Sequence, residues 1–381
     1  MMELLLVHVL PFIAAILFAV TVRGWGERFR KAMEALDLND PHPSELPPIT
    51  VLVPVRNGEA TIVPLLQDLY AQDLPRDHFR VLVVNDGSTD RTAQVVQGMQ
   101  ARWPGLLYLE ARGAGKKAAI TTGVESMGEG VVVLTDADVR CGPSRLSVLM
   151  QEWVRSGADL LLMPVVTEGG GTVVGRLQEE EQAALSAVGA AEALEGRAAL
   201  ANGANMAFSV ASFRRVGGYE GDPYASGDDI FLLQRMRKEG LRVHYLLDRR
   251  VVVRTAAEPT WSGFWRQRLR WAGKMRGTSM KANLLPFFVL LFPFLLIALT
   301  LHVSEVRMGD HLLYKWLLLL ATWALWLAPV PGLVAQAKRF THQRHAPIVA
   351  WCAFIAFTIY APVVAVASMV HRPQWKGRRI R

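Results

Sequence analysis

The chain has 381 residues, enough for one large domain or two ordinary domains, and 51% of them are hydrophobic. Its formal net charge is +8 and its mean hydropathy is +0.21, a high value for a purely soluble protein. The basic residues flank apolar segments, which favours attraction to anionic lipid headgroups over nucleic-acid binding. Since Cys141 and Cys352 are the two cysteines, we expect neither a disulfide nor a zinc site.

The first predicted element is a membrane-spanning helix over residues 4–22, a segment without formal charge. A helix needs about 20 apolar residues to cross the hydrocarbon core of a bilayer. Basic residues begin at Arg23, so the positive-inside rule predicts an outward N-terminus and a cytoplasmic location for the chain that follows. We assign residues 1–23 to the helix and residues 24–48, which end in a polar segment rich in proline, to a linker.

Apolar strands and helices alternate after the linker. This rhythm predicts an α/β fold with a mostly parallel, doubly wound sheet and right-handed crossovers, in a domain over residues 49–253. A helix rich in Glu and Ala follows Gly171, and we expect its Glu179, Glu180 and Glu181 to form a solvated face. The expected strands are 49–55, 79–84, 106–109, 131–135, 160–166, 205–210 and 241–247, and the expected helices are about 61–71, 90–101, 116–126, 175–189 and 228–239, with one more after Pro143.

The C-terminal part is expected to associate with a membrane. Residues 254–282 mix aromatic and basic side chains, a composition typical of a helix lying in the headgroup plane. Residues 283–370 contain about three apolar segments, at 284–303, 316–334 and 347–370, and residues 371–381 form a basic tail. Four crossings in total would place this tail outside, against the positive-inside rule. One C-terminal segment is therefore expected to be re-entrant or interfacial, and the sequence leaves open which one.

Two carboxylates, Asp136 and Asp138, follow the apolar run 131–135 with a spacing of i, i+2. Burying acids at the tip of a strand is costly unless a cation or hydrogen-bond donors compensate. Such tips are also where open α/β sheets bind ligands. We therefore predict a hard-oxygen site for a divalent cation, although a solvated Asp-x-Asp turn is the more frequent origin of this short pattern taken alone.

Two further loops lie at expected strand ends. Asp86, in the segment 85–90, can accept hydrogen bonds from a base or a ribose, and an ordinary Asx turn is the alternative. The segment 113–117 is similar to a phosphate-binding loop, but it lacks the first glycine of the Walker spacing and has Lys117 where Ser or Thr would bind magnesium. This argues against a P-loop NTPase, while a lysine there can still contact a diphosphate.

Taken together, these motifs resemble the inverting glycosyltransferases of family 2, which have the GT-A fold. The resemblance covers about residues 49–276, and six motifs occur in the family's order. They are the base-binding loop within 49–59, the second strand and loop at 83–90, the lysine-bearing helix start at 115–118, the Asp-x-Asp metal motif at 136–138, the acidic pair within 226–229, and Gln-x-x-Arg-Trp at 267–271. The last motif is typical of membrane-embedded members such as cellulose, chitin and hyaluronan synthases and ceramide glucosyltransferases.

The resemblance implies roles for individual residues. Asp229 is the catalytic base, and Asp228 stands where the family usually has Glu, which leaves its catalytic role open. Arg270 assists catalysis by adding positive charge near the donor diphosphate, and Asp138 with Asp136 binds Mg²⁺ or Mn²⁺. The implied donor-binding residues are Pro54, Arg56, Asn57, Glu59, Asp86, Lys117, Asp136 and Arg270, and the implied acceptor-binding residues are Asn202, Gly203, Gln267 and Trp271.

Simpler interpretations remain for two of these sets. Residues 267–271 can serve as an interface anchor of Arg and Trp, and Asn202 with Gly203 can be a loop that enters a strand.

We therefore expect a multi-pass protein of a bacterial inner membrane with a cytoplasmic catalytic domain. It would be an inverting glycosyltransferase that moves a sugar from a UDP-sugar to a membrane-associated lipid acceptor. One alternative is a processive polysaccharide synthase that extends a secreted glycan, in which a homo-oligomer supplies additional helices. The others are a non-catalytic membrane protein that binds nucleotide and a nucleotidyltransferase, which leaves residues 267–271 without a role.

Overall fold

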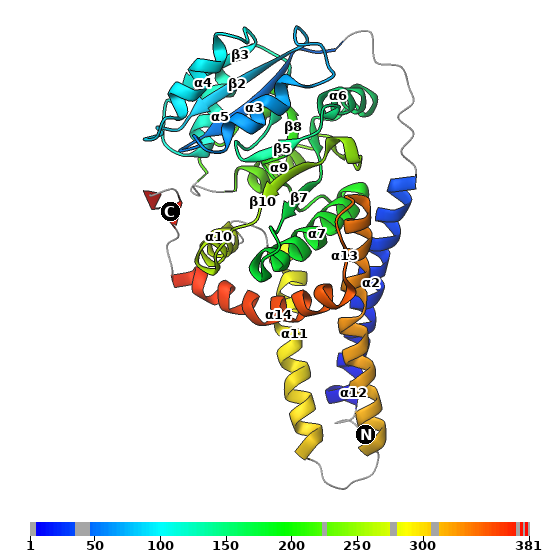
Figure 1. Cartoon of the computed structure of the whole chain (residues 1–381). Coiled ribbons are helices and arrows are strands. Elements are labelled where there is room, and N and C mark those ends of the chain that lie inside the picture. Colours follow the sequence, from blue (N-terminus) through cyan, green and yellow to red (C-terminus); the bar gives the residue numbers. More distant parts are fainter. Residues whose placement is uncertain are drawn as a thin grey trace.

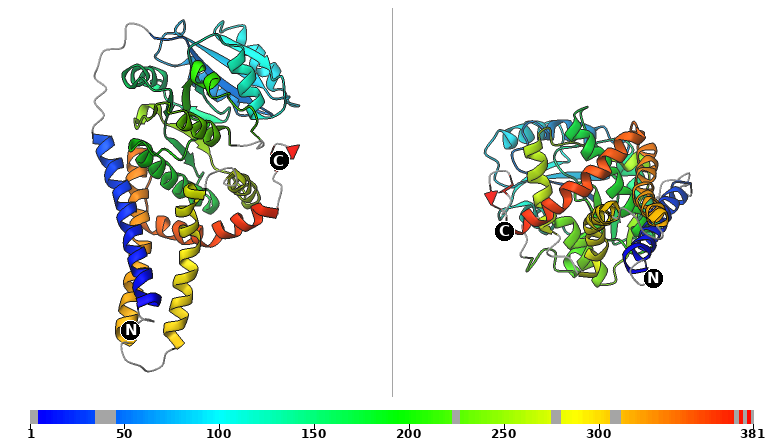
Figure 2. Two further views of the ribbon diagram at one scale, coloured as in Figure 1. Left: turned by 180° about the vertical axis from the view of Figure 1, so that it is seen from behind. Right: turned by 90° about the horizontal axis from the view of Figure 1, so that it is seen from below.

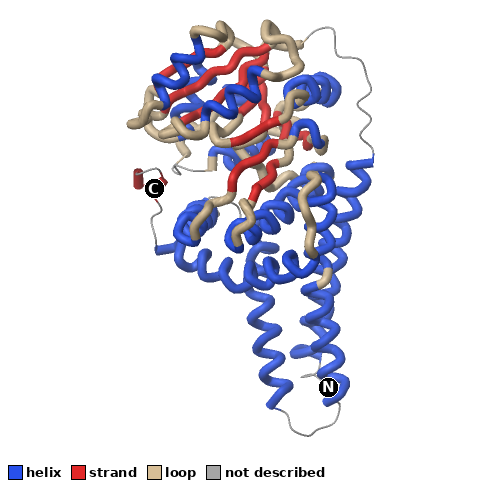
Figure 3. Tube along the Cα trace, viewed as in Figure 1, coloured by secondary structure: helices blue, strands red, loops and turns tan. Residues whose placement is uncertain are grey.

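The computed structural model describes residues 5–34, 46–222, 227–274, 280–305 and 312–370, together with 374–375 and 378–379. Strands gather at one end of the molecule and long helices at the other, as the tube in Figure 3 shows. Ser226, residues 35–45 of the expected linker and most of the basic tail lie outside the described residues.

The described strands form a mixed, mostly parallel sheet with the order β3-β2-β1-β4-β8-β6-β9 (Figure 1). The strands β1, β2, β3 and β4 are parallel to one another, whereas β8 runs antiparallel to both β4 and β6. Every residue of β1 is buried, as expected for a strand covered on both faces. The seven strands are β1 (Ile49–Val55), β2 (Phe79–Asn85), β3 (Leu106–Glu110), β4 (Val131–Leu134), β6 (Leu160–Leu162), β8 (Met206–Ser209) and β9 (Val243–Tyr245).

Helices cover both faces of this sheet. In β1, Val51 and Val53 belong to a core shared with α3, α4 and α6, whereas Leu52 belongs to a core shared with α5 and α7. This alternation along one strand is the physical basis of the doubly wound arrangement. The helices are α3 (Ile62–Tyr70), α4 (Thr92–Gln100), α5 (Lys116–Glu125), α6 (Arg145–Ser156), α7 (Val173–Leu194), α8 (Val210–Arg215) and α9 (Asp228–Lys238).

The segment predicted as one strand over 160–166 is divided between two sheets. Its first part is β6, and its second part begins β7 (Val165–Glu168), which joins β10 (Val253–Ala256) and β5 (Val139–Cys141) in a three-stranded sheet. Pro164 lies between the two parts and cannot donate to a ladder. Its carbonyl instead accepts hydrogen bonds from Asn205 Nδ2 and from the backbone N–H of Val253.

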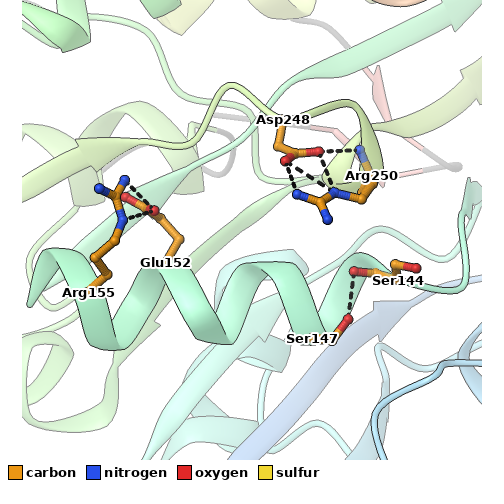
Figure 4. A network of polar contacts seen from close by, with 6 residues as sticks. All are labelled: Ser144, Ser147, Glu152, Arg155, Asp248 and Arg250. Atoms are coloured by element: carbon orange, nitrogen blue, oxygen red, sulfur yellow. Dashed lines mark hydrogen bonds and ion pairs between the residues drawn. The ribbon is translucent and has the colours of Figure 1, made fainter. Parts of the chain in front are cut away.

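Polar contacts hold α6 on the domain. Glu152 is fully buried on α6, and its carboxylate lies 2.7 Å from both Arg155 Nη2 and His244 Nε2, which joins α6 to β9. Figure 4 shows the pair of Glu152 and Arg155 beside a second ion pair, between Asp248 and Arg250. Asp248 also caps η2 (Arg249–Val251) by accepting from the backbone N–H of Arg250.

The long helix α7 joins the domain to the apolar helices. Its glutamates were predicted to form a solvated face, and this prediction is wrong. Glu180 is 3% exposed and lies 2.5 Å from Lys338 Nζ, and Glu181 pairs with Arg268. Glu179 Oε1 accepts a hydrogen bond from the backbone N–H of Gly169. Three successive glutamates point in different directions around a helix, and here each direction meets another segment.

A close backbone approach fixes the start of α7. A Cβ placed on Gly175 would overlap the carbonyl group of Gly169. We expect Gly175→Ala to lower the free energy of unfolding by about 1–3 kcal/mol, because backbone atoms cannot move aside as a flexible side chain can. Thermal unfolding in detergent measures the effect. Gly98→Ala is the control, since no atom lies within 4 Å of its added Cβ, and an equal loss in both variants would contradict the interpretation.

Among the residues that the structure describes, four apolar segments are long enough to cross a membrane by length and composition, namely Val7–Glu34, Phe287–Ser304, Leu312–Phe340 and Pro347–Val370. We conclude that the chain is an integral membrane protein. In Figure 1, α2, α11 and α12 extend beyond the domain, whereas α14 runs crosswise beneath it. These elements are η1 (Leu5–Val9), α2 (Leu10–Glu34), α10 (Trp261–Lys274), α11 (Met280–Glu305), α12 (Leu312–Leu327), α13 (Pro329–Phe340) and α14 (Pro347–Val370), followed by the short strands β11 (Gln374–Trp375) and β12 (Arg378–Arg379).

Candidate active site

Lys116 connects two of the predicted acidic motifs. Its Nζ lies 2.7 Å from Asp136 Oδ1 and 2.9 Å from Asp228 Oδ2. Asp136 follows β4, Lys116 begins α5 and Asp228 begins α9. Three segments that are distant in the sequence therefore converge at the carboxyl end of β4, the edge where open α/β sheets bind ligands.

The electrostatics of this cluster favour a positive charge. Burial of the Lys116 ammonium opposes its protonation, but the adjacent carboxylates of Asp136 and Asp228 outweigh that effect and raise the pKa of Lys116 above its usual value. The lysine therefore stays charged. Asp228 and Asp229 also lie in the first turn of α9, where the helix dipole stabilises negative charge.

The loop before β8 lies directly against the acidic pair. The backbone N–H of Gly203 donates to Asp229 Oδ2 over 3.4 Å, and Asp229 Oδ1 accepts from the backbone N–H of Ile230. Asn202 shapes this loop, because its Oδ1 accepts from the backbone N–H of Ala204. Asp229 is thus oriented by two backbone donors while it stays 8% exposed.

The contact at Gly203 leaves no room for a side chain. An added Cβ would lie 2.6 Å from Asp228 Oδ2 and 2.9 Å from Lys116 Nζ. We expect Gly203→Ala to lower turnover on the order of 10–100-fold, because the displaced groups would no longer hold their positions. Steady-state rates measure this loss. Gly128→Ala, whose Cβ would meet nothing within 4 Å, should keep full activity, and equal rates for both variants would show that the close contact is irrelevant.

The two loops predicted to bind the donor base are joined to each other. Arg56 Nη1 donates to the carbonyls of Asp86 and Gly87, at 2.7 and 2.8 Å. Asn57 Oδ1 accepts from the backbone N–H of Thr89, at 2.8 Å. The buried Asp86 accepts from the backbone N–H of Gly115 through its Oδ1, at 2.7 Å. The loops after β1 and β2 and the start of α5 thus form one connected rim.

Other predicted donor residues have structural contacts. Glu59 pairs with Arg91 at 2.5 Å and so ties the loop after β1 to the start of α4. Lys117 Nζ lies 2.7 Å from Asp222 Oδ2 rather than beside Asp136. Pro54 is buried within β1, and Asp138 is exposed beyond the end of β4. Their roles in donor or metal binding stay predictions.

The predicted acceptor motif lies on α10, where Gln267, Arg270 and Trp271 are half-buried. Arg268, which the sequence analysis did not select, is the buried member of this segment. Its guanidinium pairs with Glu181 on α7, donates to Gln267 Oε1, and lies 4.5 Å from the ring centroid of Trp271. Arg268 thus fixes α10 on α7 and covers one face of Trp271.

Sequence reasoning also missed Lys116, because it selected the adjacent Lys117. The signal that distinguishes them is the helix start. Gly115 has a φ of 99°, which only glycine adopts readily, and α5 begins at Lys116. Lys116, the first helical residue, lies at the sheet edge beside Asp136 and Asp228, whereas the next residue points about 100° away around the helix.

Comparisons with known proteins show the family to which this chain belongs. The family model described as "Glycosyl transferase family 21" matches residues 4–381. A probable glycosyltransferase of Bacillus subtilis, YdaM, is 26% identical over 60% of this chain and 55% of its own length. A poly-beta-1,6-N-acetyl-D-glucosamine synthase of Staphylococcus aureus is 22% identical over 70% of this chain and 65% of its own length. The chain therefore spans between half and two thirds of the length of these relatives.

A solved structure has the same fold. The mannosyltransferase PcManGT from Pyrobaculum calidifontis, in complex with GDP-Man and Mn²⁺, is 21% identical with a TM-score of 0.53. The match covers 94% of this chain and 96% of that protein. The predicted α/β fold of the GT-A type is thereby confirmed. With the family model matching nearly the whole chain, the protein belongs to glycosyl transferase family 21.

Proposed function

We propose that the protein is an inverting glycosyltransferase that moves a sugar from a UDP-sugar to a lipid acceptor at the membrane surface. The observation that carries this proposal is the cluster in which Lys116 bridges Asp136 and Asp228 while Asp229 lies next in the chain. It combines a site for the charges of a donor diphosphate with a separate carboxylate that can accept a proton.

A divalent cation fits the residues at this edge. Within the described part of the chain, no group of three or more His, Cys, Asp or Glu side chains could hold a metal ion alone. Mg²⁺ is commonly bound by one or two carboxylates together with substrate phosphates, and Asp136 and Asp138 offer such carboxylates. When bound, Mg²⁺ or Mn²⁺ would neutralise charge that develops on the departing diphosphate.

The protein side chains would divide the remaining work. Asp229 would take the proton from the acceptor hydroxyl, and the two backbone donors that contact it keep its carboxylate in one orientation. Lys116 and Arg270 would add positive charge near the diphosphate, and Asp86 would accept hydrogen bonds from the nucleoside. One displacement assisted by one base inverts the anomeric centre and needs no nucleophile on the enzyme.

A lipid acceptor suits the position of α10. This helix packs between the domain helix α7 and the apolar helix α14, so its predicted acceptor residues lie where the domain meets the membrane helices. Gln267 would hydrogen-bond the acceptor, Trp271 would stack on it with the face that Arg268 leaves uncovered, and Asn202 with Gly203 would border it. We place the domain on the cytoplasmic side of a bacterial inner membrane.

The test is incubation of the purified full-length protein, reconstituted in lipid vesicles, with separate radiolabelled UDP-sugars and GDP-sugars and with bacterial lipid extracts. The expected result is transfer of label from one UDP-sugar into the organic phase, with loss of transfer in EDTA and recovery with Mg²⁺ or Mn²⁺. Label retained in a high-molecular-weight product would instead indicate a polysaccharide synthase. Binding of nucleotide-sugar without release of the nucleoside diphosphate from any donor would overturn the enzymatic proposal.

A further inference from the structure

The apolar helix α14 differs in direction from the other long helices. In Figure 1, α2, α11 and α12 project away from the domain, whereas α14 stays beneath it from end to end. The view from below in Figure 2 shows α14 running across the base of the domain. Length and composition alone would allow Pro347–Val370 to cross a membrane, so its direction is a property of the tertiary packing.

One face of α14 is held by protein along most of its length. It packs on α13, α7 and α10, and to a lesser extent on α11. Phe354 lies 5.7 Å from Trp326 of α12, and Tyr360 lies 5.2 Å from Phe264 of α10, measured between ring centroids. A helix that left the domain to cross a bilayer would make such contacts at one end, whereas α14 makes them over several turns.

The opposite face of α14 is apolar and exposed. Its seven large apolar side chains are 44–86% exposed, and from Ile348 to Met369 they recur at spacings of three, four or seven residues, with Val370 directly after Met369. No Asp, Glu, Lys or Arg occurs in α14. Because α7 and α10 pack against α14, the exposed stripe lies on the part of the helix surface that these helices leave uncovered. The stripe consists of Ile348, Ile355, Ile359, Val363, Val366, Met369 and Val370.

We propose that α14 does not cross the membrane but lies in its plane, with the stripe immersed at the boundary of headgroups and acyl chains. A continuous apolar stripe of this length would be unfavourable in water. Whatever covers the stripe must be equally long and apolar. The bilayer surface reached by α2, α11 and α12 satisfies both conditions. A helix parallel to the membrane thereby anchors the domain to the lipid surface. This helix sets the distance between the domain and the lipid, whatever reaction the domain catalyses.

The proposal also removes the conflict in the charge distribution. With three crossings, by α2, α11 and α12, the segment after α14 lies on the same side as the domain. The basic residues of the tail, of the segment 338–344 and of the end of α2 then all face one side, as the positive-inside rule requires. Four crossings would place the tail on the opposite side of the membrane from the other two basic segments.

Topology reporters provide the first test. Alkaline phosphatase fused after residue 381 should be inactive in cells, like phosphatase fused after His342, whereas phosphatase inserted between α11 and α12 should be active. Green fluorescent protein at the same sites should show the converse. Active phosphatase at both the C-terminus and the α11–α12 position would place the tail outside and overturn the proposal.

Immersion depth provides the second test. In the full chain reconstituted in vesicles, a spin label is attached at Cys352, at Ile359→Cys or at Val366→Cys. Each protein also carries Cys141→Ser, and Cys352→Ser is added when position 359 or 366 is labelled, so that one cysteine remains. Accessibility to oxygen relative to a nickel chelate should be nearly equal at the three sites, although the outer two are about 21 Å apart along the helix. Phe287→Cys and Leu295→Cys, at the end and in the middle of the apolar span of α11, are the control and should differ strongly. A maximum of depth at Ile359 with shallow ends would indicate a spanning helix.

Discussion

Replacement of Asp229 by asparagine should lower the rate of sugar transfer by about 10²–10⁴-fold, the usual contribution of a general base. The amide keeps the shape of the carboxylate but cannot accept the proton of the acceptor hydroxyl. Donor binding should be little changed, because Asp136, Lys116 and Asp86 stay in place. Transfer rates, and donor affinity from a fluorescent nucleotide competition, measure the two quantities separately.

The matched control is Asp248→Asn. Asp248 has the same 8% exposure as Asp229, but its carboxylate pairs with Arg250 outside the cluster around Lys116 (Figure 4). This variant should keep the transfer rate within about a factor of three, since it removes one ion pair without touching the site. Normal turnover of the Asp229 variant would refute its assignment as the base, whatever the control shows.

Removal of Lys338 should be the most damaging single change to stability among those considered. Lys338 is 2% exposed on α13, and its Nζ lies 2.5 Å from Glu180 Oε1 and 3.7 Å from Glu179 Oε2 on α7. Lys338→Met leaves the buried carboxylate of Glu180 without its counter-charge, which costs about 3–5 kcal/mol. Thermal unfolding in detergent should show a correspondingly large fall in Tm.

The double variant Lys338→Met, Glu180→Leu tests the cause. It removes both charges and should recover most of the loss, because the apolar pair avoids the desolvation cost of the ions. The control is Glu34→Gln, which breaks the exposed pair with Arg30 on α2 and should change stability by less than about 1 kcal/mol. A double variant as unstable as the single one would mean that lost packing, not the stranded charge, explains the effect.

Much of the α/β domain could be predicted from local patterns. The strand at 49–55 was placed with its observed ends, since a fully buried parallel strand appears in the sequence as an unbroken apolar run. The same reasoning placed Asp136 at the tip of β4 and Asp228 at the start of α9. The division of 160–166 was missed, although Pro164 lies within it, because an apolar run does not reveal which sheet each half joins.

Local periodicity determined the elements, their burial and the edge at which the acids gather, because burial and backbone geometry repeat along the chain. The partners of the charged groups depended on which surfaces meet. Lys116 rather than Lys117 bridges the two acidic motifs, and the glutamates of α7 face Lys338 and Arg268 instead of water. The direction of α14 likewise depends on which surfaces meet. Its composition suits either a spanning or an in-plane helix, and the choice follows from the helices that cover one of its faces.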